Sequence, residues 1–585
     1  MIQSKILQRL FHPSSLYTQG YGSFESIGSK IKITYTKNGK IQKKEVNLDN
    51  ATDLEERIKS ELGKLILEDR HKLIATNFSG KESYETLSPK LWLDEDIVSF
   101  LANNKNQTIK IEEDLRRVAS NFDENNIAKV KLSEDNEVKV KDLISLTEYK
   151  RTCSQKEFQT LTSLVNKFKG KRLIFISSTP QGGGVAIMRH GLIRLFRVLN
   201  VNAHWYVVKP DADVFNITKR KFHNVLQAAA KPGIELTKAD EKLYNKWIRE
   251  NADFFKDKFK KADFVVIDDP QPSGLIPYIR KANPKAKIIY RSHIHIETDL
   301  TKKIGTPQYK TWQFLWKNIK LADVFISHPV ASFVPMEVPK EKVVFMPATT
   351  DPLDGLNKPL NEHYLNYYMD IFDKFTKAEN QTPLDHKRPY IIQIARFDPS
   401  KGIPYVLDAY RTLRKKFGRK SGMLPQLVIT GNGSIDDPER NLIFDETIEK
   451  INSPEFAGLK DDIKVVRLPH IDQMFNALLR RSAVVLQLST KEGFEIKVTE
   501  ALMKGKPVIA FKTGGIPLQI KDGVDGFLVK TGNSEEVASH LFELLTDSNL
   551  YVKMSKAAES YFDKSFLTIP NATRWLELCL RLGKT

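Results

Sequence analysis

The chain has 585 residues, 41% hydrophobic and 28% charged, which is the balance of a globular protein too long for a single hydrophobic core. No apolar run approaches the roughly 20 residues of a membrane span, and the start lacks the apolar stretch of a signal peptide, so we expect a cytoplasmic protein with no membrane partner. The formal net charge is +19, but the lysines are spread along the chain among acids, which favours a solvated surface over a nucleic-acid groove.

Residues 1–165 predict an accessory α+β region. Alternating residues on both sides of Asn38-Gly39 indicate two strands and a tight turn, because this pair tolerates the left-handed backbone of a two-residue hairpin. Residues 53–70 and 108–122 have the charge and spacing of helices. We find no motif that carries chemistry in this region.

From Lys171 onwards, apolar strands, glycine turns and amphipathic helices alternate. "RLIFIS" precedes three glycines and a helical stretch, and "FVVID", "KIIYR" and "DVFIS" repeat the pattern. Strands that are apolar throughout and alternate with helices are typical of a parallel sheet covered on both faces. We therefore predict a Rossmann-like domain over residues 166–350.

The same pattern returns after a polar, less regular segment at residues 351–388, which we expect to be a linker or insert. The strands "YIIQI", "QLVIT" and "AVVLQLS" predict a second Rossmann-like domain over residues 389–562. Residues 563–585 are expected to form a helix that packs back on the first domain. The predicted fold class is α/β, with two parallel-sheet domains facing a cleft.

Ligands bind beyond the carboxyl ends of parallel strands, so the loops there are the candidate sites. In "STPQGGGVA", Gly182, Gly183 and Gly184 end a strand and open a helix, which suits either an anion site or a tight turn. In "ARFDPSKG", Arg396 and Lys401 flank a turn. Two cations in one cleft suit a phosphate group, and exposed bases on a loop are the alternative.

A third loop, "STKEGFEIKVTE", contains Glu492 and Glu500, with Gly493 and Phe494 expected at the start of a helix. In one helix the two glutamates would lie about 12 Å apart along the axis. The carboxylates of a retaining glycosidase lie about 5 Å apart. We therefore expect the pair to hold opposite ends of a polar ligand and not to act in double displacement.

Together these motifs resemble the family 4 retaining glycosyltransferases, which have the GT-B fold of two Rossmann-like domains. "EGFEIKVTEALMKGKPVIAFKTGG" is similar to the family's Glu-x7-Glu region, and "STPQGGGVA", "ARFDPSKG" and "GNGS" follow the family's order. Within the family, "DDPQPSGL", "YRSHIHIE" and Glu495 look most like the fungal-type retaining trehalose phosphorylases and their clock-controlled relatives. The trehalose synthases that use a nucleotide-glucose donor are next.

The resemblance implies a phosphate site and a glucose site. Arg396 and Lys401 would clamp the phosphate, and Gly183 and Gly184 would bring backbone donors from the opposite, acceptor-side domain. Glu492 matches the part of the motif that holds hydroxyls of the transferred glucose.

The remaining residues of the Glu-x7-Glu region help to distinguish a phosphorylase from an enzyme with a nucleotide-sugar donor. The amides of Gly493 and Phe494 would also hold the transferred glucose, and Glu500 matches a residue that holds the donor ribose in nucleotide-using relatives. Glu495 stands where many of those enzymes have glycine, and a carboxylate there would repel a diphosphate. This favours the phosphorylase interpretation.

On the acceptor side, Asp269, Gln271, Arg291 and His293 match active-site residues of the same relatives. Asp269 would accept from a sugar hydroxyl, and His293 would donate to the glucose being transferred. Taken alone, Asp269 also suits a turn before Pro270, and His293 suits a buried imidazole at a strand end.

The implied reaction is reversible, retaining transfer: α,α-trehalose plus phosphate gives α-glucose 1-phosphate plus glucose. Phosphate would attack from the face that the leaving glucose departs from, so neither a protein nucleophile nor a cofactor is required. One alternative makes trehalose from UDP- or ADP-glucose and glucose. A catalytically inactive regulator with this fold is another, nucleic-acid binding ranks below it, and a homo-oligomer stays open.

Metal binding is not expected. Cys153 and Cys579 are the only cysteines, and the HxH of His293 and His295 lacks a third ligand. Asp211-Ala212-Asp213 resembles the manganese-binding DxD of a different glycosyltransferase fold, and we expect it to be a turn.

Overall fold

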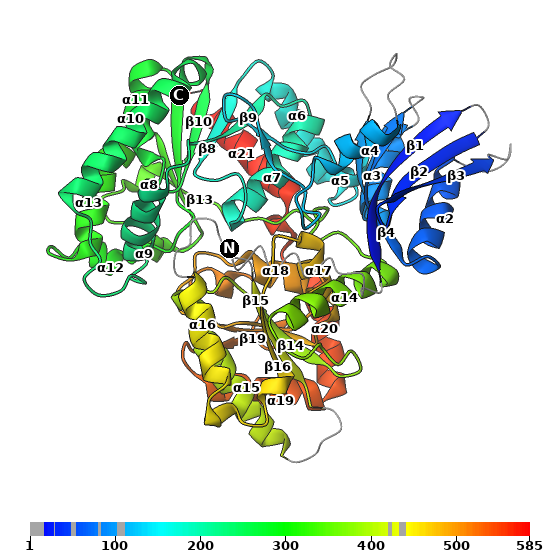
Figure 1. The fold of residues 1–585 in the computed structure, drawn as a ribbon. Helices are drawn as coiled ribbons and strands as arrows, with labels where there is room; N and C mark the ends of the chain where they lie inside the picture. Colours follow the sequence, from blue (N-terminus) through cyan, green and yellow to red (C-terminus); the bar gives the residue numbers. More distant parts are fainter. Residues whose placement is uncertain are drawn as a thin grey trace.

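The computed structural model describes residues 17–27, 30–47, 54–79, 84–101, 111–418, 424–431 and 440–584. A five-stranded mixed sheet and two six-stranded parallel sheets organise these residues (Figure 1). Among them, no helix is both long and apolar enough to cross a membrane.

The first sheet belongs to the accessory region, in the order β3-β2-β1-β4-β5. Its strands are β1 (Thr18–Ile27), β2 (Lys30–Lys37), β3 (Lys40–Asn47), β4 (His71–Ser79) and β5 (Val98–Leu101). Asn38 and Gly39 join β2 to β3 with φ angles of 52° and 73°, so the predicted hairpin is confirmed. Helices α2 (Leu54–Leu67) and α4 (Ile111–Ala119) form where helical spacing predicts them. The region also contains α3 (Tyr84–Glu95), β6 (Lys131–Leu132), β7 (Val138–Lys139) and α5 (Leu146–Lys150).

The second sheet forms the first Rossmann-like domain, and all its strands run parallel in the order β13-β12-β11-β10-β8-β9. Its strands are β8 (Leu173–Ser177), β9 (Ala203–Val207), β10 (Phe264–Asp268), β11 (Lys287–Arg291), β12 (Val324–Ser327) and β13 (Val343–Phe345). Its helices include α6 (Gln155–Phe168), α7 (Gly184–Val198), α8 (Ala212–Ile217), α9 (Asn224–Leu226), α10 (Lys238–Lys261), α11 (Ile276–Ala282), α12 (Thr298–Thr301) and α13 (Pro307–Ile319). Every residue of β8 and β10 is buried, because helices cover both faces.

The third sheet, also parallel, forms the second Rossmann-like domain in the order β16-β15-β14-β17-β18-β19. Its strands are β14 (Tyr390–Ile394), β15 (Gln426–Gly431), β16 (Ile463–Arg467), β17 (Val484–Gln487), β18 (Val508–Phe511) and β19 (Gly526–Val529). Its helices include α15 (Ile403–Phe417), α16 (Arg440–Ile451), α17 (Asp472–Arg481), α18 (Ile496–Leu502), α19 (Ser534–Thr546) and α20 (Ser548–Tyr561). The predicted α/β class with two parallel sheets is confirmed.

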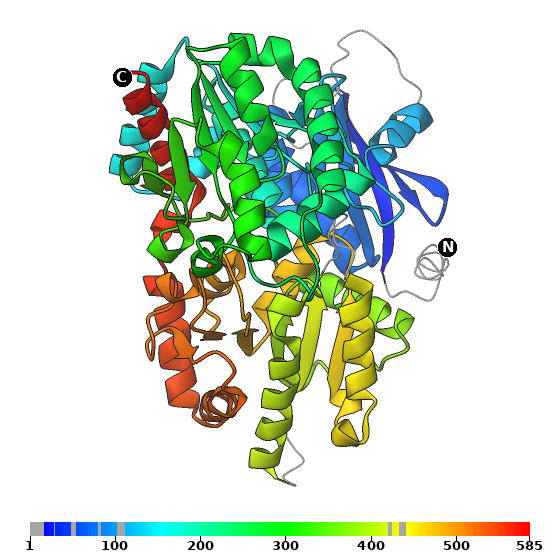
Figure 2. The ribbon, with the colours of Figure 1, turned by 90° about the vertical axis from the view of Figure 1, so that its left-hand side faces the viewer.

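The last helix, α21 (Thr568–Leu582), lies against the first Rossmann-like domain. Trp575 is 1% exposed and meets Phe175 of β8 edge to face, with ring centroids 5.2 Å apart. Figure 2 shows α21 at the outer edge of that domain, above α20 of the second one. The chain therefore crosses from the second domain back to the first before it ends.

The segment expected to be a linker or insert contains a 17-residue helix, α14 (Glu362–Ala378). Its tyrosines pack on the accessory region: Tyr364 donates to Glu95 Oε2 at 2.9 Å, and Tyr368 donates to Asp96. Lys358, just before the helix, pairs with Asp96 Oδ1 at 2.7 Å, and both side chains are fully shielded. The polar residues of this segment therefore make a buried network with the accessory region.

Removing the Asp96 carboxylate should destabilise this junction strongly. In Asp96→Ala, the buried ammonium groups of Lys72 and Lys358 lose their shared carboxylate, and breaking a buried pair costs about 3–5 kcal/mol. Asp94 is the matched control, because its carboxylate is half exposed and pairs with Lys59 at the surface, where loss costs about 1 kcal/mol or less. Urea unfolding measures both, and equal midpoints for the two variants would contradict the prediction.

Candidate active site

The loop after β14 brings the two predicted cations together. The charge of Arg396 acts on Lys401 and on Asp398 in the same loop, so the two bases lie near each other. The loop turns at Gly402, whose φ is 63° and where a Cβ would lie 1.9 Å from the carbonyl oxygen of Leu488. Only glycine fits there, and this close approach brings Lys401 to the end of β17.

Lys401 is 7% exposed and lies between two carboxylates. Its ammonium donates to Glu492 and, at 2.8 Å, to Glu495 Oε2. Burial works against the charge of Lys401, but the two glutamates outweigh it and raise the pKa of the ammonium. Burial raises the pKa of Glu492, and Lys401 outweighs burial at Glu495 and holds its pKa below the ordinary value. The cluster therefore takes up a proton more readily at Glu492.

The start of α18 differs from the expectation. The helix begins at Ile496, two residues beyond Phe494, and Glu495 is its N-cap with a φ of 67°. Glu492 therefore lies in the loop and Glu500 in the helix, so the pair does not share one helix. Phe494 is buried, with its ring 5.1 Å from that of Phe566.

Glu500 is completely buried, and both carboxylate oxygens have partners. Oε2 accepts from Lys497 at 2.6 Å, and Oε1 accepts from the Thr350 hydroxyl at 3.4 Å. Thr350 lies at the end of the first Rossmann-like domain, so this carboxylate links the two domains.

On the opposite domain, an ion pair at the end of β10 holds His293. Arg189 of α7 binds Asp268 through two hydrogen bonds of 2.8 and 2.6 Å, and both residues are buried. His293 Nε2 lies 2.9 Å from Asp268 Oδ1. Burial would raise the pKa of Asp268, but Arg189 and His293 hold it below its ordinary value. The ionised Asp268 therefore fixes the Nε2–H tautomer of the imidazole.

Burial lowers the pKa of His293 to about 4, so the ring is neutral near pH 7. With its proton on Nε2, the buried Nδ1 is an acceptor and has no partner among the described residues. This differs from the hydrogen-bond donation expected from the sequence. The buried Oε1 of Gln271 also has no hydrogen-bond partner among the described residues. These two buried acceptors can therefore bind donors such as sugar hydroxyls.

Asp269 occupies a left-handed backbone position, with φ of 68°. Its Oδ1 accepts from the His293 amide at 2.7 Å, and its own amide donates to the carbonyl of Arg291 at 2.8 Å. Burial raises its pKa to about 7 although the His293 amide opposes this. Arg291 is buried and donates to the carbonyl of Ser327 at 3.1 Å, which ties β11 to β12.

The two domains meet at Gly493. A Cβ there would lie 2.6 Å from the carbonyl oxygen of His293, so only glycine permits this approach. Beside it, the rings of His328 and Phe494 stack at 5.5 Å. A second contact joins Lys219 of the first domain to Asp398 at 3.8 Å. The loop that carries Glu492 therefore lies against the loop that carries His293.

The glycine loop opens α7 in the first Rossmann-like domain. Gly182 has a φ of 96°, which favours glycine, and Gly183 is the N-cap of α7. A Cβ built on Gly183 or Gly184 would meet nothing within 4 Å, so space lies open beside both residues. Their amides lie at a helix N-terminus, where an anion is favoured. Residues 432–434 of "GNGS" lie outside the described residues.

Three residues of this junction were missed from the sequence: Arg189, Asp268 and His328. Arg189 stands on an otherwise apolar helix face, and Asp268 ends an apolar strand, so each was visible as a charge in a buried position. The partner of each lies on another element, which no local pattern reveals. His328 gave no local signal beyond its place after β12.

The HxH and DxD patterns have structural explanations. His295 stacks on Phe333 with centroids 4.3 Å apart, and Asp211 caps α8 by accepting from the Val214 amide at 3.0 Å. The described part of the chain holds no group of three His, Cys, Asp or Glu side chains arranged for a metal.

The buried imidazoles make one contribution to stability that is lost in acid. Burial lowers the pKa of His71, His190 and His293 to about 4 from an ordinary value of 6.5. Between pH 6.5 and 4 the unfolded chain binds these protons and the folded chain does not, so each imidazole lowers the free energy of unfolding by about 1.4 kcal/mol per pH unit as the pH falls. Buried carboxyl groups with a raised pKa, such as Asp269, act in the opposite direction, so the imidazole contribution is measured by comparison with a variant. Between pH 6.5 and 5.5 the urea midpoint of His190→Gln should change less in the acid-destabilising direction than that of the wild type; the same pH dependence in both proteins would contradict the prediction.

Two family models match the chain. The model described as Trehalose synthase, N-terminal domain, matches residues 175–335, and that described as Glycosyl transferases group 1 matches residues 374–561. These ranges cover the two Rossmann-like domains in order.

The relatives that match most of this chain include trehalose phosphorylases and trehalose synthases. The trehalose phosphorylase of Pleurotus pulmonarius is 42% identical over 80% of this chain, and that of Grifola frondosa is 43% identical over 74%. The chain spans 66% and 60% of the length of these relatives. The trehalose synthase of Pyrococcus horikoshii is 33% identical over 75% of this chain and 96% of its own length.

Among solved structures, a trehalose-6-phosphate protein from E. coli bound with UDP-2-fluoro glucose superposes with a TM-score of 0.55 at 14% identity. The match covers 71% of this chain and 99% of that one, and it confirms the GT-B fold. The family predicted from the motifs is confirmed as well. The chain belongs to the group 1 glycosyltransferases of GT-B fold, among the relatives that include the trehalose synthases and the trehalose phosphorylases.

Proposed function

We propose that the protein is a retaining trehalose phosphorylase, which converts α,α-trehalose and phosphate reversibly into α-glucose 1-phosphate and glucose. The observation that carries the proposal is that both oxygens of the buried Glu500 carboxylate already accept a hydrogen bond, from Lys497 at 2.6 Å and from Thr350 at 3.4 Å. A carboxylate engaged in this way is poorly placed to hold a donor ribose. Arg396 and Lys401 supply two cationic side chains, which suit a single phosphate group.

In this proposal, phosphate binds at Arg396 and Lys401, with the amides of Gly183 and Gly184 approaching from the other domain. The phosphate gives its proton to the glycosidic oxygen as that bond breaks and attacks the same face of the glucosyl carbon. No protein nucleophile and no cofactor takes part. The fixed charges stabilise the transition state, and the closed junction at Gly493 keeps water from competing.

The sugar is held from both sides. Glu492 and the Gly493 and Phe494 amides bind hydroxyls of the transferred glucose. His293 Nδ1 and Gln271 Oε1 accept from sugar hydroxyls, since both are buried acceptors that need a donor. Asp269 accepts a hydrogen bond from a hydroxyl of the departing glucose. In the reverse direction the attacking glucose hydroxyl gives its proton to the leaving phosphate, so Asp269 only orients that glucose. Arg291 supports this edge of the site.

A nucleotide-sugar transferase is the second candidate, because the chain covers 96% of the P. horikoshii trehalose synthase. That reaction would use UDP- or ADP-glucose and would require Glu500 to hold a ribose while it also accepts from Lys497 and Thr350. Glu495 argues against it, since a second carboxylate beside Lys401 would repel a diphosphate.

Substrate dependence separates the two candidates. Purified protein is incubated with trehalose and phosphate, UDP or ADP in turn, and released glucose is measured with a coupled enzyme. We expect release with phosphate alone. Release that requires UDP or ADP would contradict the phosphorylase and support the transferase, and Glu500→Gln should then lose the activity. If no glucose is released with phosphate, UDP or ADP, both candidate functions are rejected.

A further inference from the structure

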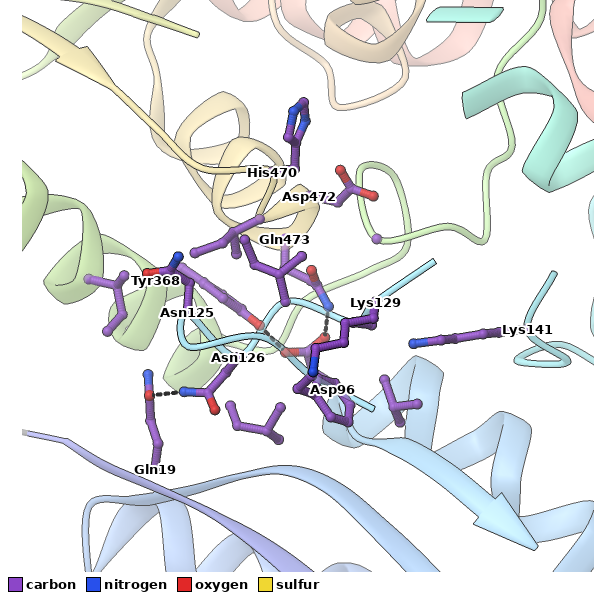
Figure 3. A pocket seen from close by; sticks show the side chains of 18 of the residues that line it. Gln19, Asp96, Asn125, Asn126, Lys129, Lys141, Tyr368, His470, Asp472 and Gln473 are labelled. Atoms are coloured by element: carbon purple, nitrogen blue, oxygen red, sulfur yellow. Dashed lines mark hydrogen bonds between the residues drawn. The ribbon is translucent and has the colours of Figure 1, made fainter. Parts of the chain in front are cut away.

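A large cavity lies apart from the candidate active site, between the accessory region, α7, α14 and the start of α17 (Figure 3). Its volume is about 950 Å³, at the upper end of the range of small-molecule sites. Neither Arg396 nor Lys401 lines it, and Glu492, Asp269 and His293 are also outside its wall. The cavity therefore has room for a ligand and shares with the candidate active site only the glycine loop, through Gly182.

Lys141 in the cavity wall lacks a hydrogen-bond partner. Its Nζ is shielded from solvent and makes no hydrogen bond to any described residue, although it lies 5.2 Å from the centre of the Phe122 ring. Burial and the charges of Lys131 and Arg194 lower its pKa to about 8, so it is still mostly charged at pH 7. Buried polar groups in native proteins nearly always have a partner, and an anion in the cavity would supply one.

The charges in the wall are unevenly paired. Lys139 pairs with Glu137 at 3.2 Å and Asp96 with Lys358 at 2.7 Å, and burial raises the pKa of Asp354 well above its ordinary value. Asp472, with a pKa raised to about 6, stays mostly ionised near pH 7. Lys129, which donates to the carbonyl of Ser120, and Lys141 also line the cavity, and Figure 3 labels both lysines. An anionic group is therefore favoured beside Lys141, whose ammonium makes no hydrogen bond to a described residue.

The remaining wall suits a ring that carries hydroxyl groups. Gln19, Asn126 and Gln473 present carboxamides, each with both donors and acceptors, as hydroxyl groups require. Trp92 and Tyr368 add aromatic surface for the apolar face of a sugar ring. Gln473 donates to Asp96 at 3.1 Å, and Gln19 accepts from Asn126, so these amides are held in place.

We propose that this cavity is a regulatory site for a phosphorylated sugar, with its phosphate at Lys141 and Lys129 and its hydroxyls at the carboxamides. Gln181 and Gly182, also in the wall, belong to the loop that opens α7 at the candidate active site, and His470 belongs to the second Rossmann-like domain. A ligand here touches the accessory region and both domains at once. It therefore favours the arrangement in which all three are together.

The test uses glucose 6-phosphate as the probe and isothermal titration calorimetry on the full chain. We expect one site per chain, at least ten-fold weaker in Lys141→Met, since a charge-assisted hydrogen bond is lost. Lys553→Met is the matched control, because that lysine is exposed on α20 and does not line the cavity. Lys553→Met and Arg396→Ala should both bind as the wild type does.

Thermal unfolding gives a second test, because the direction in which the melting temperature of Lys141→Met changes is specific to the proposal. Without ligand, Lys141→Met should melt at or above the wild-type temperature, because it removes a buried charge that has no carboxylate partner. With glucose 6-phosphate, the wild type should gain stability and Lys141→Met should not. Lys129→Met, at an exposed position of the rim, should weaken binding several-fold without affecting the fold, and it replaces Lys141→Met if that variant is unstable.

Three results would overturn the proposal: no binding of glucose 6-phosphate, binding that neither lysine variant weakens, or binding lost in Arg396→Ala, which would place the ligand in the active site. Inorganic phosphate or AMP binding as tightly as the probe would overturn the assignment to a sugar. The inference does not depend on the proposed reaction. If the protein binds glucose 6-phosphate through Lys141 but does not phosphorolyse trehalose, the cavity site is supported and the phosphorylase function is rejected.

Discussion

Arg396→Ala is expected to lower kcat/KM for trehalose phosphorolysis by about 10²–10³-fold, the loss typical when one preorganised donor to a developing anion is removed. Arg396 is the planar base beside Lys401, and its charge also acts on Asp398 and His223. Lys401 is already shared between Glu492 and Glu495, so it is poorly able to balance phosphate without Arg396.

Two controls make this loss specific. Arg411→Ala removes an arginine of the same domain that pairs with Glu455 at the surface, and it should leave kcat/KM unchanged. Added guanidinium ion should restore part of the activity of Arg396→Ala, because it replaces the missing side-chain group. A misfolded variant would regain no activity. Phosphorolysis at the wild-type rate in Arg396→Ala would reject the proposed phosphate site.

Gly493→Ala is expected to reduce kcat on the order of 100-fold, because misplacing reacting groups by about 1 Å has an effect of this size. The added Cβ would lie 2.6 Å from the His293 carbonyl oxygen, a distance that forces the two domains apart. The residues divided between them, Lys401 on one side and Asp269 on the other, would then no longer act on the same sugar.

The matched control is Gly63→Ala in helix α2 of the accessory region, where an added Cβ meets nothing within 4 Å. This variant should keep full activity and be as stable as the wild type or slightly more so. Small-angle X-ray scattering should find a larger radius of gyration for Gly493→Ala with substrates than for the wild type. Unchanged turnover in Gly493→Ala would show that the junction seen here is not needed for catalysis.

Much of the fold was predictable because buried parallel strands leave a continuous apolar signature. Strands such as β8 and β10 stand out beside the glycine turns and amphipathic helices that follow them. The helix α14 was not predicted, because its polar residues suggested a linker or insert. Tyr364 and Tyr368 recur four positions apart, as on one helix face, but their partners Glu95 and Asp96 lie in a distant part of the chain.

The candidate site was predictable only as a set of loops. Lys401 and Glu492 were named from local motifs, and the structure brings them into contact. Contacts between distant elements were beyond the reach of any local pattern: Arg189 of α7 pairs with Asp268 at the end of β10, and Glu500 accepts from Thr350 at the end of the first domain. Such pairs depend on how helices, strands and domains pack, and the second one bears on whether Glu500 is available to a ligand.

The most direct test of the central claim is to follow trehalose and inorganic phosphate with the purified protein by ³¹P and ¹H NMR, with no nucleotide present. We expect the phosphate signal to be replaced by that of α-glucose 1-phosphate, with one glucose formed for each phosphate consumed and no β anomer. The β anomer would contradict retention at the glucosyl carbon. Unchanged phosphate, with glucose 1-phosphate absent, would contradict the proposed function itself.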